Sequence, residues 1–200
     1  MRKLLVVVVL LLLLLLGVAY ATEVTTGTVI VAKPGVYKAG ESATGVLWVA
    51  SGEELEIRQK VEAGKAGQLY LIKEFVSDDV VKLRSAMNLT GPEGYASTGK
   101  DSSRLVESNC TRDSFYPIVL GKVYECEVSS VSTGNVTVRT RLRSEIISAD
   151  MDKDGRIVSY CVLEHADHGV GASTTEVCYS GDGKWIITAR VTNVVQRMET

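Results

Sequence analysis

Apolar and polar residues alternate with a period of two along much of the chain, which is the pattern of β-strands with one buried face. The clearest case is a segment in which Leu55, Ile57 and Val61 alternate with charged side chains. A glycine-containing turn follows at residues 64–67, so the next apolar segment is expected to return as the second strand of a hairpin. The strands predicted in the first half of the chain span residues 27–32, 46–51, 54–62 and 68–76.

Two segments of the first half depart from this alternation. Residues 77–79 (Ser-Asp-Asp) are typical of a helix N-terminus, and Val80, Leu83 and Met87 after them share one helical face, which predicts one short helix. Residues 90–108 contain three glycines, one proline and four serines, which is typical of a long surface loop. Whether this loop divides the chain into two subdomains stays open.

The second half of the chain predicts a meander of antiparallel strands. Asp-Gly sequences at residues 154–155 and 182–183 lie between apolar segments, and they are typical of hairpin turns. The strands predicted here span residues 118–131, 135–147, 156–163, 174–179 and 185–195. We therefore expect an all-β protein, an antiparallel meander curled into a half-barrel or a sandwich, with at most one short helix.

The first 21 residues have the three parts of an export signal. Arg2 and Lys3 precede thirteen uninterrupted apolar residues, and Ala-Tyr-Ala at residues 19–21 supplies a small-x-small cleavage site. The apolar segment is too short for a membrane-spanning helix, which needs about 20 residues. We expect cleavage after residue 21 and a single exported, β-rich domain over residues 22–200. The mature chain is expected in a periplasmic or extracellular location, with no membrane span.

The four cysteines all lie in the second half of the chain. In an oxidising compartment an even number of cysteines predicts two disulfides. None of them has the Cys-x-x-Cys spacing of a zinc ribbon or a redox pair. Of the three connectivities, we favour Cys110 with Cys126 and Cys161 with Cys178, because each pair closes a short loop between neighbouring predicted strands.

The net charge of the mature chain limits the kind of molecule that the protein is expected to bind. Removal of the signal takes away two of the 22 basic residues and none of the 24 acidic ones, so the mature chain has a net charge of −4. This balance argues against a nucleic-acid-binding protein. A row of arginines at positions 139, 141 and 143 shares one strand face, and we expect it to pair with Glu125 and Glu127 on the neighbouring strand.

Three aspartates at alternate positions are the strongest candidates for metal ligands. Asp150, Asp152 and Asp154 lie in the segment 150–157, which resembles the first eight positions of an EF-hand-type calcium loop. The resemblance implies that their carboxylates bind calcium. The twelfth position, normally glutamate, is Cys161 here, and the flanking segments are predicted strands. The alternative is an ordinary hairpin turn.

A second group of candidate ligands is a short segment that contains both histidines of the chain. His165, Asp167 and His168 are residue types that bind zinc or copper. They are few for a complete site, and a polar connecting loop is the alternative. The sequence has no Gly-x-Ser-x-Gly nucleophile motif and no phosphate-binding loop. We therefore expect a non-enzymatic protein, with a metal-dependent enzyme that uses this segment as an alternative.

One stretch of the chain carries a family resemblance. Residues 116–124 have an aromatic-Pro-apolar-x-x-Gly-x-x-aromatic arrangement, and residues 179–185 combine an aromatic residue, a turn and the start of an apolar strand. Over residues 115–195 the chain resembles exported bacterial β-domains of uncharacterised role, of the DUF3108 and TapB-like kind. It differs from them at Val123, where members usually have tryptophan. The resemblance implies a curved antiparallel sheet in the cell envelope, and no catalytic residues.

These observations together predict a non-enzymatic exported protein of the cell envelope or the extracellular space. A curved β-sheet is expected to bind an apolar, lipid-like ligand or an envelope or extracellular protein partner, and Tyr124 and Trp185 are candidates for the ligand-contacting face. We expect no nucleic-acid partner and no cofactor. The alternative in which calcium is bound is a calcium-stabilised structural module of an extracellular assembly.

Overall fold

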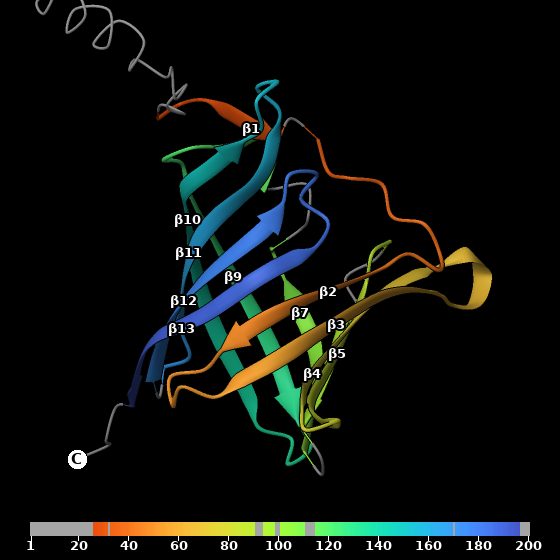
Figure 1. Ribbon diagram of the computed structural model, residues 1–200. Helices are drawn as coiled ribbons and strands as arrows, with labels where there is room; N and C mark the ends of the chain where they lie inside the picture. The colour runs from red at the N-terminus through yellow and green to blue at the C-terminus, as the bar shows by residue number, and fades with distance from the viewer. Residues whose placement is uncertain are drawn as a thin grey trace, which may run out of the picture.

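β-Strands make up nearly all the regular structure in the computed structural model of the protein (Figure 1). The structure describes residues 26–31, 33–90, 94–98, 101–110, 115–169 and 171–196. The predicted signal segment, residues 1–21, lies outside the described residues and stays a prediction. The strands are β1 (Val29–Val31), β2 (Ser42–Trp48), β3 (Glu54–Ala63), β4 (Leu69–Ser77), β5 (Val80–Asn88), β6 (Gly94–Thr98), β7 (Asp101–Ser108), β8 (Ile118–Val119), β9 (Val123–Ser132), β10 (Thr137–Met151), β11 (Ile157–Asp167), β12 (Gly171–Ser180) and β13 (Ile186–Gln196), and a 3₁₀ turn spans Lys65–Gly67.

Eleven of these strands form one closed barrel. Its order is β10-β11-β12-β13-β2-β3-β4-β5-β6-β7-β9, with β9 pairing back onto β10. All neighbours are antiparallel except β13 and β2, where residues 188–190 run parallel to residues 46–48. The all-β prediction is confirmed, but the sheet is more closed than the expected half-barrel or sandwich. The closing contact joins strands from opposite ends of the chain, so turn and alternation patterns could not reveal it.

A buried glutamine and a glycine support this closing seam. Gln59 on β3 is 2% exposed, and its side-chain amide bonds to both backbone groups of Ile186. Its Nε2 donates to the Ile186 carbonyl at 2.8 Å, and the Ile186 amide donates to its Oε1 at 3.0 Å. Gly45 on β2 lies so near this strand that a Cβ would overlap the carbonyl oxygens of Ile186 and Ile187. The glycine therefore permits the close approach of β2 to the start of β13.

The short helix predicted after residue 77 is wrong, because that segment is strand β5. Asp78 and Asp79 have φ values of 48° and 58°, and Ser77 is paired with Val80 across them. Two consecutive residues in the left-handed region form the tight loop of a β-hairpin, and aspartate tolerates that conformation. The same Asp-Asp sequence that can cap a helix therefore reverses the chain between β4 and β5.

The long loop predicted at residues 90–108 is also wrong. Strands β6 and β7 occupy most of it, with β6 paired to β5 and β7 paired to β9. Their serine-rich sequences lack the alternation that indicates a strand. These strands connect the two halves of the chain within one sheet. The remaining strands of the second half pair in the predicted antiparallel order, β9 to β10, β10 to β11, β11 to β12 and β12 to β13.

Both disulfides have the connectivity that the sequence favoured. Cys110, which follows β7, is bonded to Cys126 on β9, and Cys161 on β11 is bonded to Cys178 on β12. The second pair joins residues that lie directly opposite each other in the antiparallel register. Each disulfide thus ties neighbouring parts of the barrel together. Two disulfides are typical of exported proteins.

A separate two-stranded ribbon pairs β1 with β8, and β1 lies near the top of Figure 1. Val31 of β1 and Ile118 of β8 are buried in one apolar cluster. In that cluster they pack with inward-facing side chains of the barrel wall, among them Ile146 on β10 and Val162 on β11. The ribbon therefore packs against the inner side of β10 and β11.

Candidate functional site

A cavity of about 240 Å³ lies within the barrel. Six aromatic rings line it, together with aliphatic side chains and a few polar ones. Met87, which is 45% exposed, is the most exposed side chain of this lining and marks where the cavity meets solvent. The lining residues that carry the argument are Tyr37, Tyr116, Tyr124, Tyr160, Tyr179 and Phe115 among the aromatics, Leu71, Met87, Ile146 and Val162 among the aliphatics, and Lys73, Ser144, Glu164 and Lys184.

The period of the strands explains why these side chains meet. Successive residues of a strand point to opposite faces of the sheet, so every second residue of a barrel strand points inward. On β11 the inward positions include Tyr160, Val162 and Glu164, and on β4 they include Leu71 and Lys73. β4 and β11 therefore each contribute one charged side chain to the cavity, next to the apolar side chains of the same strand.

Lys73 and Glu164 lie on nearly opposite walls of the barrel. Strands β4 and β11 are five positions apart in one direction around the eleven-stranded order and six in the other. The two side chains line the same cavity, yet no nitrogen–oxygen pair between them lies within 4.0 Å. The cavity is thus polarised, with an ammonium on one side and a carboxylate on the other.

Burial shifts the pKa values of Lys73 and Glu164 so that the neutral form of each side chain is favoured. It lowers the pKa of the Lys73 ammonium, and the negative charge of Glu164 opposes this shift. It raises the pKa of the Glu164 carboxyl, against the opposing effects of Lys73 and of the Tyr179 hydroxyl. That hydroxyl donates to Glu164 Oε1 at 3.4 Å, and burial raises the pKa of Tyr179 well above its usual value.

Lys73 and Glu164 differ in their hydrogen-bond partners. Glu164 has the Tyr179 hydroxyl, whereas the Lys73 ammonium makes no hydrogen bond to any residue that the structure describes. An ammonium has three donors and no acceptor. Because Lys73 also lines the cavity, its ammonium is available to an acceptor on a bound molecule.

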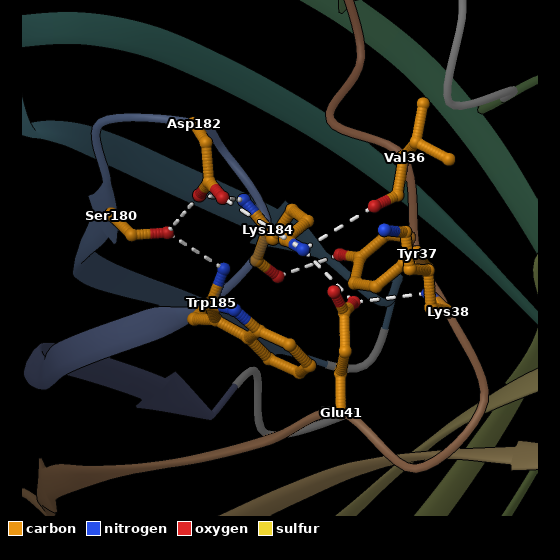
Figure 2. A network of polar contacts seen from close by, with 8 residues as sticks. All are labelled: Val36, Tyr37, Lys38, Glu41, Ser180, Asp182, Lys184 and Trp185. Atoms are coloured by element: carbon orange, nitrogen blue, oxygen red, sulfur yellow. Dashed lines mark hydrogen bonds and ion pairs between the residues drawn. The ribbon is translucent and has the colours of Figure 1, made fainter.

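The segment between β1 and β2 is fastened to the cavity wall by Lys184, as Figure 2 shows. Lys184 Nζ lies 2.9 Å from Glu41 Oε2 and donates to the Val36 carbonyl at 3.3 Å. The Tyr37 hydroxyl donates to the carbonyl of Lys184 at 2.6 Å. The hydrogen bond from Lys184 lowers the pKa of the Glu41 carboxyl. These contacts hold the ring of Tyr37 against the cavity.

The turn between β12 and β13 is ordered by its own polar groups. Ser180 Oγ donates to Asp182 Oδ1 at 2.6 Å and accepts from the Trp185 amide at 3.0 Å (Figure 2). Gly183 in this turn has a φ of 70°, and a Cβ there would lie 2.8 Å from the hydroxyl oxygen of Tyr116. Glycine therefore satisfies both the left-handed conformation and the close approach of a cavity tyrosine.

Of the two aromatic residues that the sequence suggested for ligand contact, Tyr124 lines the cavity and Trp185 does not. Trp185 instead packs edge-on against Tyr37, with ring centroids 5.5 Å apart. Trp185 therefore contacts the cavity residue Tyr37 without lining the cavity itself. Lys73 and Glu164 are not among the site residues that the sequence suggests, although each occupies an inward position of a strand whose neighbouring inward residues are apolar.

The three aspartates of the EF-hand-like segment lie in the hairpin between β10 and β11. Asp152 Oδ1 accepts hydrogen bonds from the amides of Asp154 and Arg156, both at 2.9 Å. Asp150 Oδ2 accepts from Ser159 Oγ at 2.7 Å. The structure does not gather these carboxylates into a cluster of ligand atoms. Asp152 has the geometry of a residue that closes the turn through its side chain.

The histidine segment is also dispersed. His165 Nδ1 lies 3.0 Å from Thr174 Oγ1, and His168 Nδ1 lies 2.9 Å from Thr140 Oγ1. Asp167 Oδ1 accepts from the Gly169 amide at 2.9 Å. Within the described ranges, the one group of three metal-type ligands within 4.8 Å is Cys161, Glu176 and Cys178, whose two sulfurs are already joined in a disulfide.

The predicted pairing is confirmed for two of the three arginines of the row, on the outer face of β9 and β10. Arg141 lies opposite Glu127 with 3.6 Å between Nε and Oε2, and Arg143 lies opposite Glu125 with 3.7 Å between Nε and Oε1. Exposed pairs of this kind contribute about 0–1 kcal/mol to stability. Arg139 lies opposite Ser129 and has no ion pair with a described residue.

Comparison of the chain with protein-family models, with curated proteins and with solved structures finds no match in any of the three. The resemblance of residues 115–195 to exported β-domains therefore rests on their own sequence and stays a prediction. Among the described residues, no helix is both long enough and apolar enough to cross a membrane.

Proposed function

We propose that the protein is a non-enzymatic exported binding protein, and that it holds a small, mainly apolar molecule inside its barrel. The observation that carries this proposal is the cavity of about 240 Å³ with its lining of aromatic and aliphatic side chains. Binding sites for small molecules are concave and mostly apolar, with a few polar groups that set orientation. The cavity has these properties, and its polar groups are few.

The volume of the cavity limits the size of the ligand. A cavity of about 150 Å³ lined by aliphatic and aromatic side chains accommodates benzene, whereas sites for drug-sized ligands measure about 300–1,000 Å³. The present cavity lies between these values. A molecule with one or two rings, or with a short acyl chain, therefore fits better than a long-chain lipid.

The cavity also favours an internal ligand over a protein partner as the main object of binding. On the outer face, Arg141 and Arg143 are already paired with glutamates, whereas the interior offers a mostly apolar surface and an ammonium without a described partner. An internal ligand would cover this surface and would give the ammonium an acceptor.

Two neighbouring isoleucines on β10 provide a matched test. Ile146 is 3% exposed and lines the cavity, whereas Ile147 is 41% exposed on the opposite face of the same strand. Toluene is the probe, and calorimetric titration measures its binding. Ile146→Trp should fill the cavity and weaken toluene binding at least tenfold, while Ile147→Trp should bind as the wild type does. Equal binding by both variants, or no binding of toluene by the wild type, would contradict the proposal.

A further inference from the structure

Among the described residues, the charged groups that line the cavity are those of Lys73, Glu164 and Lys184. The Lys184 ammonium is already engaged by the Glu41 carboxylate at 2.9 Å and by the Val36 carbonyl at 3.3 Å. Within the described lining, Lys73 and Glu164 are therefore the charged groups that remain for a ligand.

The two groups have opposite charges when both are ionised, with an ammonium on Lys73 and a carboxylate on Glu164. Burial shifts the pKa of each group toward the neutral form, and the attraction between them opposes both shifts. The ionised pair adds no net charge to the described lining of the cavity.

A charged ligand would meet a like charge in the same cavity. An anion beside Lys73 would also face the Glu164 carboxylate, and a cation beside Glu164 would also face the Lys73 ammonium. Repulsion between like charges that share a partly buried site weakens the binding of either ion. An uncharged ligand avoids both situations.

The hydrogen-bonding capacity of the two groups indicates which polar group the ligand carries. Glu164 accepts the Tyr179 hydroxyl, so part of its capacity is used within the protein. The donors of Lys73 have no described partner, and a donor needs an acceptor. The carbonyl oxygen of a ketone, aldehyde, ester or amide is an uncharged acceptor of suitable strength, and an apolar body attached to it would lie among the rings of Tyr124 and Tyr160.

We propose that the ligand of the barrel is an uncharged carbonyl compound with an apolar body of one or two rings, and that the Lys73 ammonium donates a hydrogen bond to its carbonyl oxygen. This inference rests on the proposed binding function and specifies the chemical class of the ligand. Lys73 selects for the acceptor, and Glu164 excludes anions of the same shape.

Four small probes of similar size separate these effects: acetophenone, ethylbenzene, benzoate and benzylammonium. Their dissociation constants for the wild-type protein at pH 7.5 should rank acetophenone as the tightest, by about 10- to 100-fold over ethylbenzene, since a hydrogen bond to a charged group contributes a factor in that range. Benzoate and benzylammonium should bind at least tenfold more weakly than acetophenone. Benzoate that binds as tightly as acetophenone would overturn the proposed class of ligand.

Variants at Lys73 and Glu164 test whether these two residues determine the preference among the four probes. Lys73→Met should abolish the advantage of acetophenone over ethylbenzene, and Glu164→Gln should strengthen benzoate binding at least tenfold, because the anion then balances Lys73. The double variant Lys73→Met with Glu164→Gln removes both of these charges and leaves Lys184 paired with Glu41, which keeps the test valid if a single variant folds poorly. It should bind acetophenone and ethylbenzene equally. Lys82→Met, at an exposed position on β5, is the control and should change nothing.

The outcomes distinguish this inference from the proposed function. If ethylbenzene and acetophenone both fail to bind the wild type, the binding function itself is wrong. If both bind with equal affinity, or if Lys73→Met retains the preference for acetophenone, the cavity binds apolar molecules but the role assigned to Lys73 is wrong.

Discussion

Replacing Gln59 by leucine should open the seam at which the barrel closes. The side chain of Gln59 is 2% exposed and satisfies both backbone groups of Ile186, at 2.8 and 3.0 Å. Leucine has nearly the same size but neither donates nor accepts, so the amide and the carbonyl of Ile186 would stay buried without partners. This position is the strongest test of the closure because β2 and β13 share a short parallel pairing beside it.

The size of the effect follows from these two groups. A buried polar group that loses its partner costs about 1–3 kcal/mol, so two of them cost about 2–6 kcal/mol. Burial of the leucine side chain offsets about 1–2 kcal/mol of this. The free energy of unfolding should therefore fall by about 3 kcal/mol, which for a domain of this size corresponds to a decrease in Tm of about 6–12 °C.

Urea denaturation followed by circular dichroism measures this loss, and hydrogen exchange locates it. The amides of residues 186–190 should exchange faster in Gln59→Leu, because the seam opens before the rest of the barrel. The control is Lys60→Leu, the next residue along β3, whose exposed pair with Glu62 contributes about 0–1 kcal/mol. A loss of less than about 1 kcal/mol in Gln59→Leu would refute the assigned role.

Three other changes test separate parts of the structure. Asp152→Ala should lower the free energy of unfolding by about 1 kcal/mol, equally in calcium and in EDTA, while Asn in its place keeps the acceptor and most of the stability; a calcium-dependent difference would instead indicate a metal site. Because the pKa of Glu41 is lowered in the folded state, its contact with Lys184 stabilises the fold above the usual carboxyl pKa and is lost as the pH falls through the lowered value. The stability of the wild type relative to Glu41→Gln should therefore decline below about pH 4.5 in denaturation series, and a constant difference down to pH 2 would argue against the contact. Removing the disulfide by Cys161→Ala with Cys178→Ala should cost about 3 kcal/mol in the same assay, and unchanged stability would contradict the tie between β11 and β12.

The sequence predicts those strands whose pairing is local and whose alternation is clear. Leu55, Ile57 and Val61 occupy inward positions of β3, and the meander from β9 to β13 follows from its turns. The sequence predicts a helix in place of β5 because Asp78 and Asp79 suit both a helix cap and a tight hairpin loop. Nothing local in the sequence separates these two uses, and the pairing of β5 with β4 decides between them.

The candidate site could be predicted only in part, because a barrel brings together residues that are distant in sequence. The sequence suggests Tyr124, which lines the cavity, but neither Lys73 nor Glu164. Their signal is a charged side chain at an inward position, after Leu71 on β4 and after Val162 on β11. The alternation of the sequence is enough to find a charged side chain at an inward position. That Lys73 and Glu164 face the same cavity, however, depends on closure of the barrel by β13 and β2.

The position of a bound probe tests the central claim most directly. Intermolecular nuclear Overhauser effects between toluene and the methyl groups of the protein report which side chains it contacts. A ligand inside the barrel should give effects at Ile146 and Val162, which line the cavity, and none at Ile147 on the outer face of the same strand. Effects at Ile147 without effects at Ile146 and Val162 would place the probe on the outer surface and contradict an internal binding site.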